Sequence, residues 1–440
     1  MDFRIYLKFE ICILSFEIYH FEFVFCKQII TLKNKTVLII GLVWPEPKSS
    51  AAGTRMLQLI DLFQKQDFDI IFASAAQESE FSFDLKSIGV ASQKIKLNCA
   101  SFDTFITELE PEIVLFDRYI IEEQFGWRVY ENCPNAIRIL DTEDLHCLRL
   151  ERQIAVKKNI HFELSDLLNS DIAKREIASM YRCDITLIIS EFEMEVLNSV
   201  FKIDIDLLHY LPMFYSNLNT DNLANFQERK DFVFIGNFLH EPNFDAVKQL
   251  KEKIWTKISK QLPEAKMHIY GAYPSQKVFQ MHNEKDRFYV HGRAENAQST
   301  IKSARILLAP LRFGAGLKGK LLEAMIVGTP SVTTNLGCEG ISNHNYWNGF
   351  VTDDFDDFIS KSVELYKDEN LWINLQKNGF EIIDKQFKME TFEKLFLEKI
   401  NQVGVTLANH RKQNFIGNLL FYHTNLSTKY MSKWIEEKNK

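Results

Sequence analysis

A run of glycines and basic residues between positions 309 and 330 carries the clearest chemistry in the sequence. Gly314 and Gly316 follow a short apolar run, and Arg312, Lys318 and Lys320 place positive charge around them. Glycines let backbone N–H groups approach an anion, and a helix that begins after such a loop adds partial positive charge at its N-terminus. The pattern predicts a phosphate cradle that needs no metal ion.

Glu323 lies one turn into the helix predicted over residues 318–327. A carboxylate at that position can accept two hydrogen bonds from the hydroxyls of a ribose. Glycines that serve only packing, with lysines that are merely solvated, would give a similar pattern. The combination of Lys318, Glu323 and two α/β units favours a nucleotide site.

The elements that must position this loop alternate regularly along the chain. Short apolar runs, typical of buried strands, are separated by longer amphipathic segments, typical of helices. This alternation predicts parallel sheets covered by helices on both faces. The expected strands are 36–41, 69–74, 113–117, 137–140 and 185–190, and then 232–236, 266–271, 288–292, 306–310 and 331–334.

The polar stretch 216–230 divides the strands into two groups, so we expect an α/β fold with two Rossmann-like domains facing each other across a cleft. The first domain spans 36–215. Residues 216–230 form the linker, and the second domain spans 231–403. Residues 1–35 form an N-terminal extension, either an added strand or helix or an upstream start outside the fold. Residues 404–440 form a helical tail, which we interpret as a solvated closing helix rather than a membrane or partner contact.

Composition excludes several classes of protein. A net charge of −7 argues against nucleic acid as the main partner. The seven cysteines are scattered singly, which predicts neither a zinc site nor a disulfide framework and favours the cytoplasm. Charged residues interrupt the apolar N-terminal stretch, so we expect at most a peripheral membrane contact.

The glycine-rich segment resembles the donor-binding stretch of glycosyltransferase family 4, in the branch with a G-A-G-x-K-x-K loop. Four further motifs follow the family's order: 234–247 (FIGNFLHEPNFDAV), 269–271 (IYG), 291–293 (HGR) and 337–341 (GCEGI). The resemblance implies the GT-B fold, a nucleotide-sugar donor, sugar transfer with retention, and no cofactor or metal. It places six residues at the donor: Gly53, Arg312, Gly314, Gly316, Lys318 and Glu323.

Two positions depart from the family pattern. The first member of the family's glutamate pair falls on Ala315, so the backbone of Gly314 and Gly316 is expected to replace that carboxylate. Asn237 and Asn243 stand near the family's basic residues after the first strand of the donor domain. Lys318 and Arg312 are then expected to carry the diphosphate charge.

Two loops of the first domain are expected to complete the site. Gly53 matches the family's N-terminal glycine loop, although a close helix–sheet contact would also explain a glycine there. Arg55 is a candidate for added charge in the cleft. The loop 141–149 resembles the histidine-bearing loop beside the acceptor, which predicts that His146 acts in transfer and that Asp144 orients it. The alternative is a histidine that only caps or packs.

Three other functions use the same architecture. A nucleotide-sugar epimerase would act without an acceptor. A metal-dependent transferase would bind its ion through Asp141, Glu143 and Asp144, and a non-catalytic protein would only bind the nucleotide sugar. The favoured prediction is transfer to a sugar, lipid-linked or protein acceptor in glycan or polysaccharide biosynthesis.

Overall fold

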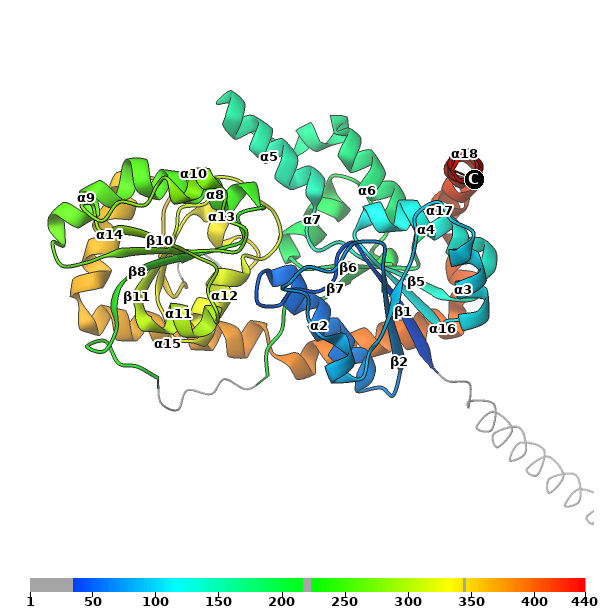
Figure 1. Ribbon diagram of the computed structural model, residues 1–440, viewed down its shortest axis with the longest axis horizontal. Coiled ribbons are helices and arrows are strands. Elements are labelled where there is room, and N and C mark those ends of the chain that lie inside the picture. Colours follow the sequence, from blue (N-terminus) through cyan, green and yellow to red (C-terminus); the bar gives the residue numbers. More distant parts are fainter. Residues whose placement is uncertain (1–34, 217–222, 343–345, 440) are drawn as a thin grey trace, which may run out of the picture.

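The structure, a computed structural model, describes residues 35–216, 223–342 and 346–439. The predicted extension therefore lies almost entirely outside the described residues. Two α/β domains lie side by side, each with one sheet between helices (Figure 1). All strand pairings within the two sheets are parallel, which confirms the predicted fold class.

The first sheet has seven strands in the order β3-β2-β1-β4-β5-β6-β7. Five of them were predicted, and the two missed strands, β3 and β7, are short edge strands. The four residues of β3 are all exposed, so no apolar run marks them. The bounds are β1 (Thr36–Gly41), β2 (Asp69–Ser74), β3 (Ala91–Lys94), β4 (Ile113–Asp117), β5 (Ile137–Asp141), β6 (Ile185–Ile188) and β7 (Leu208–Tyr210).

The second sheet has six strands in the order β10-β9-β8-β11-β12-β13. Its first five strands were predicted within two residues at either end, and only the three-residue edge strand β13 was missed. The bounds are β8 (Lys230–Ile235), β9 (Met267–Tyr270), β10 (Phe288–Gly292), β11 (Ala304–Ala309), β12 (Ser331–Thr333) and β13 (Gly349–Val351).

Helices cover both faces of each sheet. Around the first sheet lie α2 (Ala51–Gln64), η1 (Leu85–Ile88), α3 (Ser101–Leu109), α4 (Tyr119–Asn132), α5 (His146–Lys158), η2 (Leu164–Asn169), α6 (Asp171–Arg182), α7 (Glu191–Ser199) and η3 (Ile205–Leu207). Around the second lie α8 (Glu241–Gln249), η4 (Leu250–Ile254), α9 (Trp255–Gln261), α10 (Gln276–Phe279), α11 (Ala297–Ser303), α12 (Gly319–Ile326), α13 (Asn335–Cys338), α14 (Phe355–Lys367) and α15 (Glu369–Gln386).

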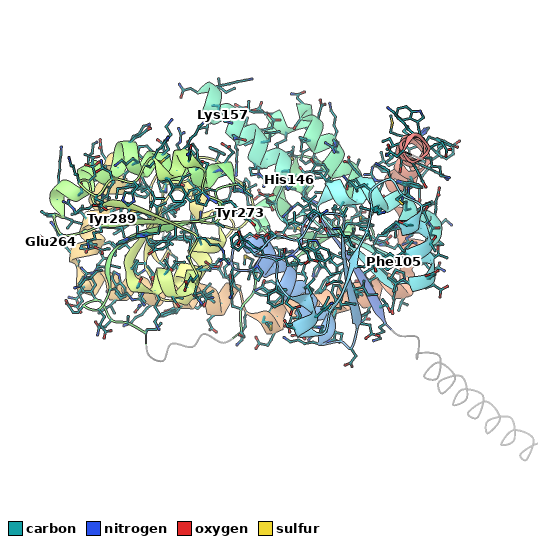
Figure 2. All side chains as sticks on the ribbon, viewed as in Figure 1. Phe105, His146, Lys157, Glu264, Tyr273 and Tyr289 are labelled. Atoms are coloured by element: carbon teal, nitrogen blue, oxygen red, sulfur yellow. The ribbon has the colours of Figure 1, made fainter. Side chains whose placement is uncertain are left out.

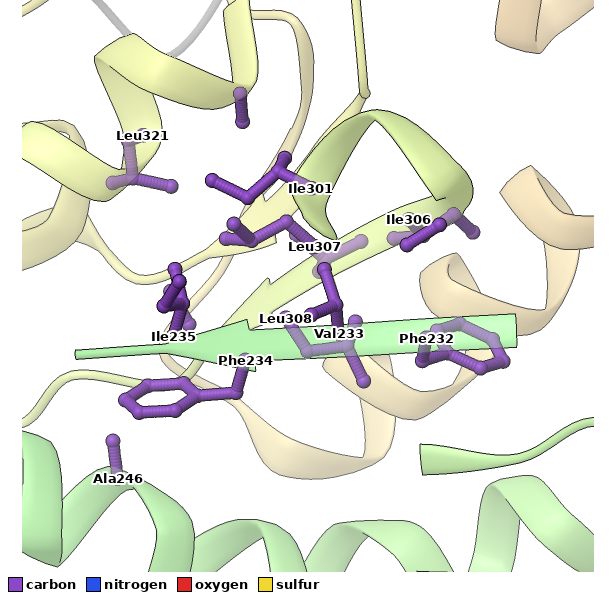
Figure 3. Packing of buried hydrophobic residues seen from close by; sticks show 14 of the residues in the cluster. Phe232, Val233, Phe234, Ile235, Ala246, Ile301, Ile306, Leu307, Leu308 and Leu321 are labelled. Carbon is purple, nitrogen blue, oxygen red and sulfur yellow. The ribbon is translucent and has the colours of Figure 1, made fainter. Parts of the chain in front are cut away.

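In the first sheet, the central strands β1, β4 and β6 are mostly apolar because both of their faces are buried. Val37 and Ile39 of β1 pack in a core with α2, while Leu38 and Ile40 pack in a second core with α3 and α4. One continuous core surrounds the second sheet. Figure 3 shows part of it, with Phe234 of β8 directed toward Ala246 of α8.

The chain returns to the first domain at its C-terminal end. Helix α16 (Met389–Gln413) places Phe392, Phe396 and Val403 in the core that lies under β1 and α2. Residues 389–403, which we expected with the second domain, therefore pack on the first. The tail continues as α17 (Phe415–Leu420), the π-helical turn η5 (Phe421–Asn425) and α18 (Leu426–Lys438).

The chain passes between the domains twice, once after Tyr215 and once near Phe387, and these two segments are joined by backbone hydrogen bonds. The Tyr215 N–H donates to the Phe387 carbonyl at 2.8 Å, and the Met389 N–H donates to the Tyr215 carbonyl at 3.0 Å. Among the described residues, no helix is long and apolar enough to cross a membrane.

Candidate functional site

A cleft of about 720 Å³ lies between the carboxyl ends of the two sheets. Loops after β1, β4 and β5 form its first wall, and loops after β8, β9 and β11 form the second. It brings together most of the residues predicted from the sequence, from both domains: Gly53, Asp144, His146, Gly314, Gly316, Lys318 and Glu323.

The predicted cradle is the start of α12. Lys318 is the residue before the helix, and its Nζ donates to the Gly316 carbonyl at 2.8 Å and lies 3.7 Å from Glu339 Oε1. Burial lowers the pKa of Lys318, although the nearby Glu339 carboxylate opposes this shift. The Lys318 ammonium thus lies in the cleft wall with little water around it. In such a place its attraction to a bound anion is stronger than it would be in bulk water.

Lys320 and Glu323 lie together on the first turns of α12 and both line the cleft. Burial lowers the pKa of Lys320 to about 7, and burial raises the pKa of Glu323 to about 7. Each shift is limited by the opposite charge of the other residue. Lys320 also donates to Asn243 Oδ1, so the asparagine found near a family basic position orients a lysine instead.

Arg312 does not reach the cleft, contrary to the sequence prediction. Its guanidinium forms two hydrogen bonds with Asp245 of α8, one of them 2.8 Å from Nε to Oδ2, and its side chain is 35% exposed. Asp245 lies 67 positions away in the chain, so no local sequence pattern indicates this ion pair. Lys320, two residues after Lys318, lines the cleft instead.

The glycine loop is held by side chains of the first domain. The Gly316 N–H donates to Glu193 Oε1 at 2.8 Å, and the Gly314 carbonyl accepts from Arg152 at 2.9 Å. We expected these backbone groups to replace the missing family carboxylate at Ala315. The Gly316 N–H is instead engaged by Glu193, which also accepts from the Leu145 N–H at 2.9 Å.

Gly316 is required by conformation and by space. Its φ is +63°, and a Cβ there would lie 2.9 Å from the Asp144 Cβ across the cleft. Arg152 adds a bidentate ion pair with Glu339, with one N–O distance of 2.7 Å. The donor loop and the histidine loop are therefore in direct contact.

Further polar contacts close the cleft near β1. The Tyr273 hydroxyl donates to Glu46 at 2.8 Å, and Arg293 Nε donates to Ser49 Oγ at 3.3 Å. His146 and Tyr273 both lie where the two domains meet (Figure 2). These hydrogen bonds join the two domains at this end of the cleft.

His146 begins α5 and faces the cleft. Its Nε2 lies 3.4 Å from Asp144 Oδ1, its ring packs edge-on against Tyr119, and its backbone N–H is capped by Glu176. Burial lowers the pKa of His146 to about 4 despite the neighbouring carboxylate. The imidazole is therefore neutral at pH 7 and suited to hydrogen bonding rather than to carrying charge.

Asp144 lies next to His146, as the sequence predicted, but Asp144 also has a second partner. It also forms an ion pair with Arg149. Burial favours the protonated form, but the positive charges of Arg149 and of protonated His146 outweigh it and lower the pKa of Asp144. Asp144 thus remains ionised and can fix the orientation of the ring.

Gly53 lines the cleft, but its surroundings favour the packing interpretation. A Cβ there would lie 2.4 Å from the Glu46 backbone, and its N–H already donates to the helix cap Ser50 Oγ at 3.1 Å. Arg55 is buried away from the cleft wall, where it forms a bidentate pair with Asp141 at 2.8 to 3.1 Å.

The Arg55 pair also bears on metal binding through Asp141, Glu143 and Asp144. Asp141 forms an ion pair with Arg55, and Asp144 forms one with Arg149. Within the described ranges, no three His, Cys, Asp or Glu side chains group as metal ligands.

Three further titratable side chains line the cleft, and of these Glu143 was considered above only as a metal ligand. Glu143 has a φ of +62°, and burial together with nearby Asp141 raises its pKa to about 8. Asp117, at the end of β4, accepts from the Leu42 N–H at 2.9 Å, and burial raises its pKa. His240, after β8, also lines the cleft. Asp117 is the last residue of β4 and Glu143 follows β5 by two residues, and this position at the carboxyl end of a strand is the signal in the sequence.

The comparisons with known proteins agree with this geometry. Residues 229–368 match the family model described as glycosyl transferases group 1. No curated protein sequence matches the chain.

Solved structures resemble the chain at low sequence identity. TarM aligns with a TM-score of 0.65 and 11% identity over 85% of this chain and all of that one. HepE from Anabaena, in complex with UDP and glucose, aligns at 0.61 and 12% over 84% of this chain and all of HepE. Sucrose-phosphate synthase from Thermosynechococcus elongatus aligns at 0.61 and 13%, also over 84% and 100%. Against an S. aureus TarM complex, the chain spans 58% of that chain's length. Residues 229–368 are therefore similar to a group 1 glycosyl transferase domain, and the chain has the GT-B fold of these structures.

Proposed function

We propose that the protein transfers a sugar from a nucleotide-sugar donor to an acceptor hydroxyl with retention of anomeric configuration, in glycan or polysaccharide biosynthesis. The observation that carries the proposal is the basic start of α12, where Lys318 and Lys320 line a cleft closed by both domains. HepE, which shares the fold, has been crystallised with UDP-glucose, which supports this class of donor.

On the donor side, Lys318 and Lys320 bind the diphosphate and Glu323 accepts from the ribose hydroxyls. The departing nucleoside diphosphate gains negative charge in the transition state, and fixed positive groups in a dry cleft stabilise it. The acceptor hydroxyl attacks from the face that the nucleotide leaves, and a donor phosphate oxygen takes its proton. This route requires no side-chain nucleophile. His146, held by Asp144, contacts the acceptor or the transferring sugar.

The donor assignment is tested with a panel of nucleotide sugars screened for thermal stabilisation. A donor present at 100 times its dissociation constant should add about 2.7 kcal/mol of stability. NMR of the product with a matching acceptor then reads the anomeric configuration. Inversion contradicts the retaining mechanism. Conversion of the donor without an acceptor favours an epimerase, and binding without any conversion favours a non-catalytic protein.

We predict that the nucleoside diphosphate binds without a divalent metal, because Lys318 and Lys320 supply the positive charge. Calorimetry in EDTA and in excess magnesium should give dissociation constants within about threefold of each other, a difference of about 0.65 kcal/mol. Binding that appears only with magnesium or manganese would exclude this arrangement.

We also predict that nucleotide binding takes up a proton at pH 8. Free Lys320, with its pKa lowered to about 7, is mostly neutral there, and a bound diphosphate raises that pKa. Affinity should accordingly fall as the pH rises above 7. Calorimetry at pH 8 in Tris and in HEPES, whose ionisation enthalpies differ, should give different apparent enthalpies.

The variant Lys320→Met is the matched control, since it keeps the side-chain length and removes the titrating group. It should abolish the buffer dependence. Equal enthalpies in the two buffers for the unmodified protein would mean that Lys320 does not bind the diphosphate.

A further inference from the structure

The C-terminal helices expose an unusual set of aromatic and aliphatic side chains. Phe415 is 72% exposed, Tyr422 70%, Tyr430 64% and Trp434 59%. Their spacing of seven, eight and four residues places them about whole turns apart along α17, η5 and α18. Ile416, Leu419, Leu426 and Met431 are also exposed between them. We call these eight residues the C-terminal stripe.

The opposite face of α18 is fixed to the first domain, so the stripe is not an unpacked end. Ser432 is buried and accepts from Arg128 at 3.2 Å, and Glu436 accepts from the Ala100 N–H at 3.1 Å. At the start of the segment, Phe421 stacks on Tyr130 with ring centres 4.5 Å apart. The helix is therefore held in place by one face while its apolar face points outward.

The charge of this segment is opposite to that of the remaining chain. Residues 404–440 contain six Lys and Arg and two Glu, a net charge of +4, whereas residues 1–403 carry −11. Lys433 and Lys438 are exposed beside the stripe, and Lys438 lies over the Trp434 ring at 5.1 Å. A basic C-terminal segment on an acidic protein favours a negatively charged partner.

The residue types point to a lipid surface rather than to another helix. Tyr and Trp have an apolar ring and a polar edge, which suits the boundary between headgroups and acyl chains, and lysines extend from there toward the phosphates. A helix that pairs with another protein helix through a seam presents mainly Leu, Ile or Val at its contact positions. In this stripe half of the residues are aromatic, and Lys433 and Lys438 flank it.

We propose that the C-terminal stripe docks the protein on anionic membranes, with α18 lying in the plane of the interface. A helix of this kind binds by its buried apolar face together with attraction to anionic lipids. The proposal is independent of the assigned transfer reaction. In Figure 1, α18 lies on the outer side of the first domain, away from the second domain, so docking leaves the cleft accessible.

The tryptophans make the test selective. Trp434 is exposed, whereas Trp44, Trp127, Trp255, Trp347 and Trp372 are each at most 5% exposed. With vesicles of phosphatidylglycerol and phosphatidylcholine at 1:1, fluorescence should shift to the blue, and brominated lipids should quench it. The variant Trp434→Phe keeps an apolar ring and should remove the signal while the protein still cosediments with the vesicles.

Cosedimentation of further variants separates the two contributions. Tyr430→Ser combined with Trp434→Ser should lower vesicle binding at least about tenfold. Lys433→Glu with Lys438→Glu should do the same, since each basic residue near such a surface contributes about fivefold. Val405→Ser, a change at an 89% exposed apolar residue of α16 outside the stripe, should leave binding unchanged.

Two results would overturn the proposal. One is equal binding to pure phosphatidylcholine, or none to either vesicle, by the intact protein. The other is a concentration-dependent dimer in sedimentation velocity that the Tyr430→Ser, Trp434→Ser variant abolishes, without vesicle binding, since the stripe would then be an interface between copies of the chain. Nucleotide affinity should be the same in all the variants, which confirms that they are folded.

Discussion

Replacing Lys318 with alanine should weaken nucleoside diphosphate binding, and transfer with it, by at least about tenfold. The ammonium is in the wall of the cleft with little exposure to water, so few waters replace it when it is removed. A charge-assisted hydrogen bond lost from such a place costs roughly 1.5–3 kcal/mol. Calorimetry gives the change in affinity, and circular dichroism shows whether the variant is folded.

Arg312→Ala is the matched control because it removes a positive charge from the same loop. Its guanidinium is bound to Asp245 outside the cleft, so nucleotide affinity should change less than about twofold. The two variants therefore separate the site described here from the one expected from the sequence. Unchanged affinity in a folded Lys318→Ala protein would show that the start of α12 does not bind the diphosphate.

Replacing His146 with alanine should lower the rate of transfer by about 10² or more while nucleotide affinity barely changes. The residue lies in the cleft across from α12, next to Asp144, and makes no contact with the two lysines of the donor site. The measurement is kcat with saturating donor, together with calorimetry of the nucleotide.

The neutral state of His146 gives this prediction a second readout. Because its pKa is lowered to about 4, its protonation does not change between pH 5.5 and 8, so it should add no step to the pH profile of kcat there. His146→Gln keeps a hydrogen-bonding side chain and should retain more activity than alanine. The exposed His161, just after α5, serves as the control, since His161→Ala should leave transfer unchanged. Loss of nucleotide affinity in His146→Ala, equal to the loss of activity, would contradict an acceptor-side role.

Most of the sheet framework could be predicted because burial on both faces leaves a strong mark on the sequence. Runs such as 37–40 and 113–116 are apolar throughout, and central strands of parallel sheets have this composition. The edge strands β3 and β13 lack such a run, since an edge strand is shorter and partly exposed. We placed the first part of helix α16 in the second domain because it follows that domain in the sequence. Its residue Phe396 instead packs in the core of the first domain.

Site residues that lie together in one short segment could be predicted from the sequence. Contacts between residues that are far apart in the chain could not. The glycine loop, Lys318 and Glu323 form one short segment, and all of them line the cleft. The partners of Arg312, Gly316 and Arg55 come from 67, 123 and 86 positions away. Such pairs are fixed by the packing of whole domains, which local patterns do not record.

The path of α16 has a consequence for the order in which the protein is made. The last strand of the first sheet ends at Tyr210, but the same core includes Phe396 and Val403, roughly 190 residues later. At about 5–20 residues per second, a ribosome needs on the order of 10–40 s to make that stretch. During this time the apolar face of the first domain stays uncovered, while the ribosome makes all the strands of the second domain. The nascent chain thus completes its second domain first, and chaperone binding should concentrate on the β1 and α2 surface that α16 later covers.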